Sequence, residues 1–213
     1  MIVIPEIIEA IKHRLMVELP GRKSHIKMAP IANNELFRPF DPPDIFKESG
    51  VLVPLLNDEH DGLQVLLTLR SSDLKHHSGQ ISFPGGRREK GESLKETALR
   101  ETNEEIGIAH QSIEILGGLS TLYVPPSNTV IHPFVGYIKE LNKLEINPDE
   151  VDEVIYVSIS DLLDIKNYRK DPWDFSGRIV DVPYWNINHN VPLWGATAMI
   201  LHEFIDIYND INH

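Results

Sequence analysis

The sequence of 213 residues contains no cysteine, which excludes disulfide bonds, thiolate catalysis and the common cysteine-ligated zinc sites. Long apolar runs are also missing, since none approaches the roughly 20 residues needed to cross a bilayer. The N-terminal residues show neither the basic start nor the small-residue cleavage site of a signal peptide. We therefore expect a cytoplasmic protein that has no membrane partner.

Basic residues are few compared with acidic ones. The chain has 20 Lys and Arg against 32 Asp and Glu, and its formal net charge is −12. This balance disfavours broad nucleic-acid binding, so no nucleic-acid partner is expected. An anionic substrate would have to be attracted by a bound cation or by a local cluster of basic side chains.

The pattern of apolar residues predicts an α+β fold. Apolar positions at helical spacing over residues 5–19 predict an amphipathic helix, and residues 20–50 are rich in proline and polar residues. We expect residues 1–49 to form this helix and an extended lead-in, and residues 50–213 to form the main domain. Few helices flank many strands there, which favours a mixed sheet. Strands are predicted over residues 51–56, 63–70, 81–83, 113–119, 130–138, 154–159 and 179–185, and helices over 94–106, 161–163 and 193–208.

The helix over residues 94–106 has clear signals at both ends. Ser93, with Glu96 three residues later, forms the pattern of a capping box, which places the N-cap at Ser93. Gly107 occupies the position where a left-handed residue commonly ends a helix. Local sequence alone therefore predicts where this helix begins and ends.

Three carboxylates share one arc of that helix. Glu101, Glu104 and Glu105 are spaced at i, i+3 and i+4, beside a mostly apolar stripe that should face the core. At an effective dielectric of 20, neighbouring carboxylates about 6 Å apart repel by roughly 3 kcal/mol. A partly buried group of this kind requires a cation or a raised pKa. The alternative is a solvated acidic helix face, which is common in proteins.

A longer sequence pattern that includes these glutamates favours a cation site over a solvated acidic helix face. Its fixed positions follow the spacing G-x5-E-x7-R-E-U-x-E-E-x-G-U, where U is a bulky aliphatic residue, and this pattern resembles the Nudix box. Thr102 departs from it, because an aliphatic residue is preferred there, but threonine is close to valine in volume. The resemblance implies a Nudix-type α/β/α sandwich with a mixed β-sheet, in which the box forms a loop–helix–loop. The matching residues are Gly86, Glu92, Arg100, Glu101, Glu104, Glu105 and Gly107.

A segment upstream of the box resembles one particular branch of the family. Residues 66–86 are similar to the run L-L-T-x-R-S…L-x-x-H-x-G-Q-x-x-F-P-G-G of the coenzyme A diphosphatase branch of the Nudix family. Residues 119–127 and 193–198 also resemble that branch, and the resemblance covers roughly residues 50–210. It implies metal-dependent hydrolysis of the diphosphate of coenzyme A to 3′,5′-ADP and 4′-phosphopantetheine.

The resemblance also implies a metal site for Mg²⁺ or Mn²⁺, which would neutralise the charge of the diphosphate and activate a water. Glu101 and Glu105 are expected as the principal ligands, and Glu104 as a further ligand or as a base. The Gly85 carbonyl is a further candidate ligand. Many family members add an acid from a late loop, and within residues 147–153 we choose Glu150 as this catalytic acid. The alternative for that run is an ordinary solvated turn.

Other residues are expected to shape the box or to bind the substrate. In the box, Glu92 and Arg100 are interpreted as a structural ion pair, and Gly86 and Gly107 as structural glycines. The substrate is expected to be a small, coenzyme A-like dinucleotide. The candidate substrate-binding residues are Arg70, His77, Gln80 and Arg87.

Two other functions stay open at this point. One is a Nudix pyrophosphatase that acts on another nucleoside diphosphate derivative, such as ADP-ribose or NADH. The other is a non-catalytic, nucleotide-sensing Nudix domain, which the complete set of box carboxylates disfavours. The residues do not separate free coenzyme A from its acyl or oxidised forms, and family members are sometimes homodimers.

Overall fold

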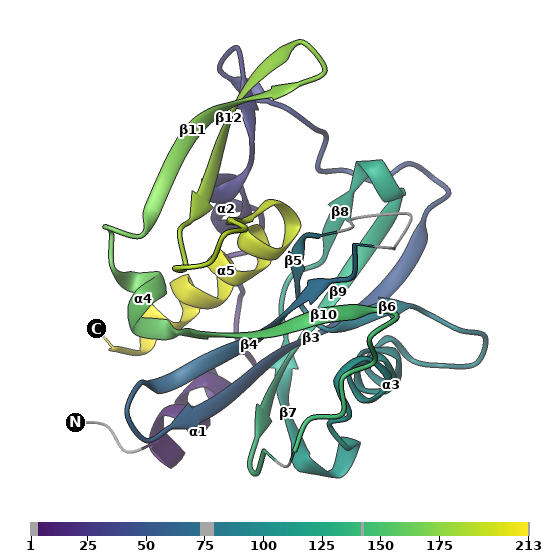
Figure 1. Cartoon of the computed structure of the whole chain (residues 1–213), viewed down its shortest axis with the longest axis vertical. Helices are drawn as coiled ribbons and strands as arrows, with labels where there is room; N and C mark the ends of the chain where they lie inside the picture. Colours follow the sequence, from purple (N-terminus) through teal and green to yellow (C-terminus); the bar gives the residue numbers. More distant parts are fainter. Residues whose placement is uncertain (1–3, 73–78, 142, 213) are drawn as a thin grey trace.

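The computed structural model describes residues 4–72, 79–141 and 143–212 (Figure 1). The helices are α1 (Ile4–Arg14), α2 (Arg22–His25), α3 (Leu94–Ile106), α4 (Ile159–Leu163) and α5 (Gly195–Asn212), with short 3₁₀ turns at Ile26–Met28, His110–Ser112 and Pro125–Ser127. The strands are β1 (Ile31–Ala32), β2 (Glu35–Leu36), β3 (Lys47–Asp58), β4 (Gly62–Arg70), β5 (Ile81–Ser82), β6 (Gly85–Arg87), β7 (Ile113–Gly118), β8 (Leu122–Val124), β9 (Thr129–Ile138), β10 (Val151–Ser158), β11 (Tyr168–Phe175), β12 (Arg178–Trp185) and β13 (Leu193–Trp194).

The larger sheet carries the order β10-β4-β3-β9-β7, and the short strands β5, β6 and β8 pair with β4, β3 and β9. The pairing of β3 with β9 is parallel, while β3 with β4, β4 with β10 and β7 with β9 are antiparallel. The sheet is therefore mixed, as predicted.

Helices cover both faces of this sheet. In β3, Leu52 and Leu56 belong to the core cluster that contains Ala98 of α3, whereas Val53 and Leu55 belong to the cluster that contains α1 and α5. Because side chains alternate across a strand, a strand with helices on both faces is apolar throughout. Figure 1 shows α3 on one side of the larger sheet and α1 on the other. The predicted α+β sandwich is confirmed.

A smaller sheet contains strands from both the N-terminal and the C-terminal parts of the chain. Its order is β11-β12-β1-β2, and β13 pairs with β12. The N-terminal strand β1 meets β12 through the pairing of Ile31 with Asp181. In Figure 1 the long hairpin of β11 and β12 rises above the larger sheet, on the side away from α1.

Several predicted elements differ from the observed ones. The first helix ends at Arg14 rather than near residue 19, and residues 22–28 are helical where an extended lead-in was predicted. Their backbone is held by contacts with α5, which local composition does not reveal. Strand β11 was not predicted, and the last helix begins at Gly195 rather than at residue 193. The domain boundary at residue 50 stays a prediction. Among the described residues, no helix is long and apolar enough to cross a membrane.

A buried carboxylate ties the N-terminal segment to the sandwich. Glu203 of α5 is fully buried, and it accepts hydrogen bonds from the backbone nitrogens of Gly21 at 2.9 Å and Ser120 at 3.0 Å. His25 lies 3.1 Å from the same carboxylate. Burial alone would raise the pKa of Glu203, but the hydrogen bonds from His25 and Ser120 hold it below its ordinary value.

We expect Glu203→Gln to destabilise the protein by about 2–4 kcal/mol, because the amide turns a donor toward groups that themselves donate. The carboxylate has a lowered folded-state pKa, so its contribution is present above the unfolded pKa and is lost as the pH falls through the folded value. Urea denaturation between neutral and acidic pH measures both effects. The variant should therefore show a weaker loss of stability in acid than the wild type.

Glu9→Gln is the matched control, because Glu9 is exposed and its nitrogen–oxygen distance to Lys12 is 3.9 Å. Its free energy of unfolding should change by less than about 0.5 kcal/mol. Equal losses in the two variants would contradict the role given to Glu203.

Candidate active site

The acidic helix α3 has the ends that the sequence predicts. Glu96 accepts a hydrogen bond from the Ser93 backbone at 2.8 Å, Ser93 accepts one from the Glu96 backbone at 3.3 Å, and Gly107 is left-handed with φ of 75°. Thr102, which departs from the aliphatic pattern, is fully buried, and its hydroxyl donates to the Ala98 carbonyl at 2.7 Å. That bond satisfies the hydroxyl within the helix, so the departure leaves no unpaired polar group.

Glycines allow α3 to lie unusually close to the sheet. A Cβ on Gly50 would lie 2.1 Å from the Leu94 carbonyl oxygen, and one on Gly86 would lie 2.4–2.5 Å from the Glu101 carboxylate. Gly50 and Gly86 are also direct partners in the pairing of β3 with β6. The glycine that begins the box is therefore required because the carboxylate of Glu101 occupies the space of its missing side chain.

Three carboxylates converge beside this contact. Glu101, Glu105 and Glu150 each offer an oxygen, and these oxygens all lie within 4.8 Å of one another. Glu105 is 1% exposed. Carboxylate oxygens are the ligands that Mg²⁺ and Mn²⁺ prefer. The donor set of this carboxylate trio therefore fits a hard divalent cation.

Glu150 reaches the trio through Asn147. The Asn147 backbone nitrogen donates to the carbonyl of Glu105 at 2.9 Å, and its side-chain amide donates to the Glu150 carboxylate at 3.3 Å. One asparagine thus connects the loop before β10 to the end of α3. The local sequence around Asn147 gives no sign of this role, because the contact with Glu105 spans more than 40 residues.

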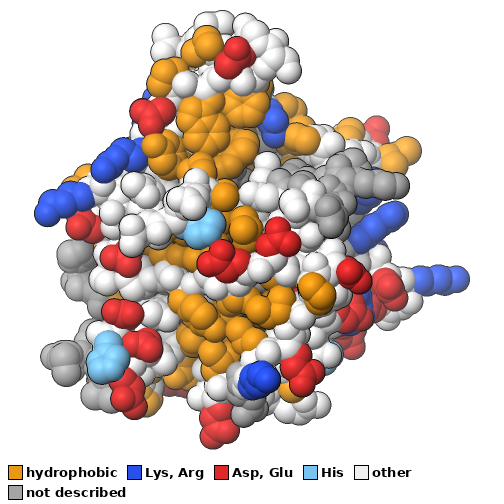
Figure 2. Space-filling view, viewed as in Figure 1, with side chains coloured by type: hydrophobic (Ala, Val, Ile, Leu, Met, Phe, Trp, Pro, Cys, Tyr) orange, Lys and Arg blue, Asp and Glu red, His pale blue; other side chains and the backbone are white. Residues whose placement is uncertain are grey.

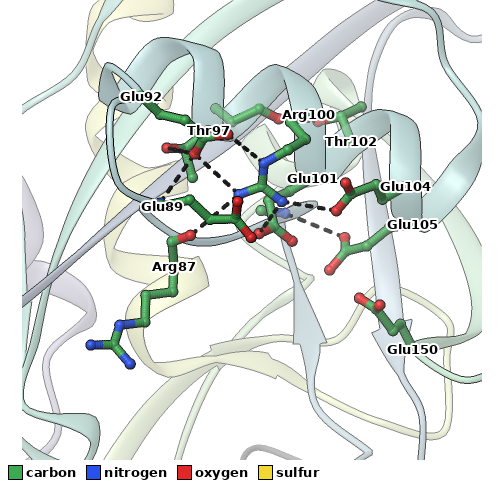
Figure 3. A network of polar contacts seen from close by, with 12 residues as sticks. Arg87, Glu89, Glu92, Thr97, Arg100, Glu101, Thr102, Glu104, Glu105 and Glu150 are labelled. Atoms are coloured by element: carbon green, nitrogen blue, oxygen red, sulfur yellow. Dashed lines mark hydrogen bonds and ion pairs between the residues drawn. The ribbon is translucent and has the colours of Figure 1, made fainter.

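Burial makes the charged form of the trio carboxylates unfavourable when no cation is bound. It raises the pKa of Glu105 to about 8, although Arg70, at 3.5 Å, and the Gly85 backbone nitrogen, at 3.3 Å, oppose this change. Burial also raises the pKa of Glu101. Figure 3 shows Glu101, Glu105 and Glu150 directed toward one another. A bound cation would stabilise the charged form of all three.

Arg100 connects the box loop to the acidic arc (Figure 3). Its guanidinium lies 2.6 Å from Glu92, 2.9 Å from Glu101 and 2.8 Å from Glu104. It also donates to the Arg87 carbonyl at 3.3 Å. The hydrogen bond with Arg100 lowers the pKa of Glu92 to about 2. The expected ion pair between Glu92 and Arg100 is therefore present.

Glu104 differs from the other two glutamates of the arc. Its side chain is 52% exposed, and it lies outside the trio while contacting Arg100. The roles of ligand or base that were expected for Glu104 stay predictions. Gly85 meets the trio through its nitrogen, so the expected role of its carbonyl stays a prediction too.

A cleft of about 610 Å³ opens next to the trio. Of the predicted substrate-binding residues, Arg70, Gln80 and Arg87 line it, and so do Gly85 and Gly86. His77 lies outside the described residues. The volume is within the range of small-molecule sites.

The cleft is basic although the protein is acidic. Its charged lining residues are Arg38, Lys47, Arg70 and Arg87, and among the described residues no Asp or Glu lines it. The view in Figure 2, by contrast, shows many acidic side chains across the surface. The arrangement favours an anionic ligand that lies between basic side chains and a carboxylate trio able to hold a cation.

Besides Asn147, further residues of this site were not predicted from the sequence. A glycine inside an apolar strand indicates close backbone approach, and that signal was available for Gly50. The others carry no local signal, because their strands or turns join the cleft only through the smaller sheet and the start of β3. They are Arg38, Lys47 and Phe175, whereas Trp194 lies within residues 193–198, which resemble the coenzyme A diphosphatase branch.

We expect Mn²⁺ binding to displace a proton from Glu105. Since burial raises the pKa of Glu105 to about 8, its carboxyl group is largely protonated below that pH, and a cation must compete with the proton. Affinity should rise by about tenfold per pH unit up to that pKa and then level off. Calorimetry at neutral pH in buffers of different ionisation enthalpy measures the released proton. Glu105→Gln should abolish the release, and a wild type that releases none would contradict the raised pKa.

Gly86→Ala should weaken Mn²⁺ binding by about 10–100-fold, because the new methyl group must displace the Glu101 carboxylate. The fold should persist, since the displaced atoms are the end of a flexible side chain. Gly118→Ala is the control, because its Cβ would have only an ordinary contact of 3.6 Å with the Pro133 carbonyl. Titration with Mn²⁺ and thermal unfolding compare the two variants. Wild-type affinity in Gly86→Ala would contradict the steric role of Gly86.

Comparisons with known proteins agree with the geometry of the site. A model of the NUDIX domain family matches residues 47–177. Nudix hydrolase 3 of Caenorhabditis elegans is 35% identical over 176 residues, which cover 75% of this chain and 72% of the relative. The uncharacterized Nudix hydrolase NudL of Photorhabdus laumondii is 35% identical over 159 residues, 74% of this chain and 82% of the relative.

A solved structure supports the fold alone. The MutT/nudix family protein from Enterococcus faecalis has a TM-score of 0.53 and 19% identity, over 81% of this chain and 66% of that protein. The family match spans more than half of the chain and includes the box, the trio and most of the cleft. The chain therefore belongs to the Nudix hydrolase family, whose members use divalent cations to hydrolyse nucleoside diphosphate derivatives.

Proposed function

We propose that the protein hydrolyses the diphosphate bond of coenzyme A to 3′,5′-ADP and 4′-phosphopantetheine. The observation that carries this proposal is the convergence of three separate segments on one cleft. Residues 66–86, 119–127 and 193–198 resemble the coenzyme A diphosphatase branch, and members of each line the cleft. Separate segments of the sequence thus meet where the substrate would lie.

The charge of the cleft supports the same substrate. Coenzyme A carries a diphosphate and a separate 3′-phosphate, so it presents more negative charge than a simple dinucleotide. Arginine suits phosphate because its planar donors bind two oxygens at once. Arg70, which contacts Glu105, and Arg87, which belongs to the box loop and lines the cleft, are our candidates for binding the diphosphate.

Glu101, Glu105 and Glu150 would hold Mg²⁺ or Mn²⁺, which supplies charge neutralisation and water activation when bound. The residues of the chain position these groups. Arg100 orients Glu101 while it braces Glu92, and Asn147 orients Glu150. Glu104 remains the candidate base or further ligand, because it lies next to the trio and Arg100 fixes one of its oxygens.

A substrate panel tests the proposal. The protein is incubated with Mg²⁺ or Mn²⁺ and with coenzyme A, ADP-ribose, NADH and nucleoside triphosphates, and the products are identified by mass spectrometry. We expect coenzyme A to have the highest kcat/KM and to yield 3′,5′-ADP. Glu105→Gln should lower kcat by several orders of magnitude while the fold persists, and Glu9→Gln should leave it unchanged.

The outcomes separate the alternatives. Faster cleavage of ADP-ribose or NADH would show that the preferred substrate is another dinucleotide and not coenzyme A. Binding without cleavage under either cation would indicate a nucleotide-sensing domain and would contradict the enzymatic proposal. Full activity in Glu105→Gln would contradict the metal assignment but not the substrate.

A further inference from the structure

One end of the cleft includes residues that lie outside the part of the chain matched by the family model. Arg38 follows β2 and Trp194 lies in β13, so both are outside residues 47–177 that the family model matches. Phe175 ends β11 of the smaller sheet and lines the same cleft. The cleft is therefore lined from both sheets, and the carboxylate trio lies on the side of the larger one.

Arg38 is an arginine with unused donors. Its guanidinium lies 5.4 Å from the centre of the Phe37 ring, and among the described residues it has no ion-pair or hydrogen-bond partner. Other arginines of this acidic chain do find carboxylates: Arg14, Arg22, Arg70, Arg88 and Arg100 all form ion pairs. An arginine that faces a cleft without a carboxylate partner has its planar donor fork free for an anion.

A second cation increases the need for an anion at this end. The Arg178 guanidinium lies 5.0 Å from the centre of the same Phe37 ring, and it too has no ion-pair partner in the part of the chain that the structure describes. Two cations that share one ring repel each other unless negative charge lies nearby. Only Arg38 of the two lines the cleft, so the anion would meet Arg38.

An aromatic wall stands beside Arg38. The rings of Phe175 and Trp194 are 6.0 Å apart, and Trp194 packs edge-on against Trp173 at 5.0 Å. Phe37 is 5.3 Å from Phe175, so the same ring that supports Arg38 supports the wall. Fixed aromatic rings that line a cleft suit a planar base, which stacks with little ordering cost.

The basic residues are divided between two ends of the cleft. Arg70 contacts Glu105, so its guanidinium lies at the end of the trio, whereas the side chain of Arg87 extends from the box loop away from the trio (Figure 3). Arg38 follows β2 of the smaller sheet, and among the described residues it forms no hydrogen bond or ion pair with the trio. Lys47 begins β3 two residues before Ser49, the partner of Arg87, and also lines the cleft. This division fits a ligand that carries a diphosphate and a separate phosphate.

We propose that Phe175, Trp194 and Arg38 form a subsite for a phosphorylated nucleoside, in which the rings receive the base and Arg38, assisted by Lys47, binds a phosphomonoester remote from the diphosphate. The inference rests on the proposed function, under which this group is the 3′-phosphate of coenzyme A. Arg38 and Trp194, which lie outside the family match, would then contribute to specificity.

The test compares ligands that differ by one phosphate. Calorimetry measures binding of 3′,5′-ADP and 5′-AMP, and kinetics with Mg²⁺ compare coenzyme A with dephospho-coenzyme A. We expect Arg38→Gln to weaken 3′,5′-ADP binding, and to lower kcat/KM for coenzyme A mainly through KM, by about 10–100-fold. 5′-AMP and dephospho-coenzyme A should change by less than about twofold, because they lack the phosphate that Arg38 would bind.

Matched variants separate charge, stacking and folding. Arg178→Gln removes a cation from the Phe37 ring but not from the cleft. The ratio of the affinities for 3′,5′-ADP and 5′-AMP should therefore stay at its wild-type value. Phe175→Ala should weaken both nucleotides to a similar degree, since both contain the base. Thermal unfolding shows whether Arg38→Gln remains folded, and Arg38→Lys should restore part of the preference for the extra phosphate.

Equal losses for the two members of each ligand pair, or no loss at all in Arg38→Gln, would overturn the subsite. A wild type that binds 3′,5′-ADP no better than 5′-AMP would also overturn it. Failure of the proposed function has a different signature. In that case coenzyme A is not cleaved, while the binding comparison still decides whether Arg38 recognises the phosphate.

Discussion

The burial of Glu105 is the constraint on which the site depends. Its carboxylate can reach the backbone nitrogen of Gly85 only because α3 lies close to the sheet, and glycine at positions 50 and 86 makes that approach sterically feasible. The same approach removes water from Glu105, so the charged form needs Arg70 and a cation. The close packing of α3 and the burial of Glu105 therefore have the same cause, because only glycine at positions 50 and 86 allows α3 to lie this close to the sheet.

Local sequence signals predicted the box helix correctly. They did not predict the smaller sheet or the position of Arg38, because both depend on strand pairing between distant parts of the chain. Ser93, Glu96 and Gly107 fix the ends of α3 through contacts within a few residues, which a sequence displays directly. Strands β1 and β2 are two residues each and form only against each other and β12. Strand β11 contains Pro172 and several charged residues, and its position at the sheet edge tolerates both. Arg38 joins the cleft through these strands, so its place could not be read from its neighbours in sequence.

The cleft also explains how an acidic protein can receive an anionic ligand. A net charge of −12 repels an anionic ligand at long range, so recognition must come from positive charges at short range. The lining supplies them as basic side chains that face the cleft, while carboxylates elsewhere neutralise most of the other arginines. The carboxylate of Glu203 links the N-terminal segment at Gly21 to the loop at Ser120, which precedes β8.

The smaller sheet has a consequence for synthesis on the ribosome. A nascent chain that has emerged as far as Ser158 already contains every strand of the larger sheet and all three trio carboxylates. The wall of the cleft needs Phe175 and Trp194, and β12 must then return to pair with β1 near the other end of the chain. Pairing of such high contact order forms late. In the order of synthesis, the residues of the cation site therefore precede those of the aromatic wall and of α5, which completes the core of the larger sheet.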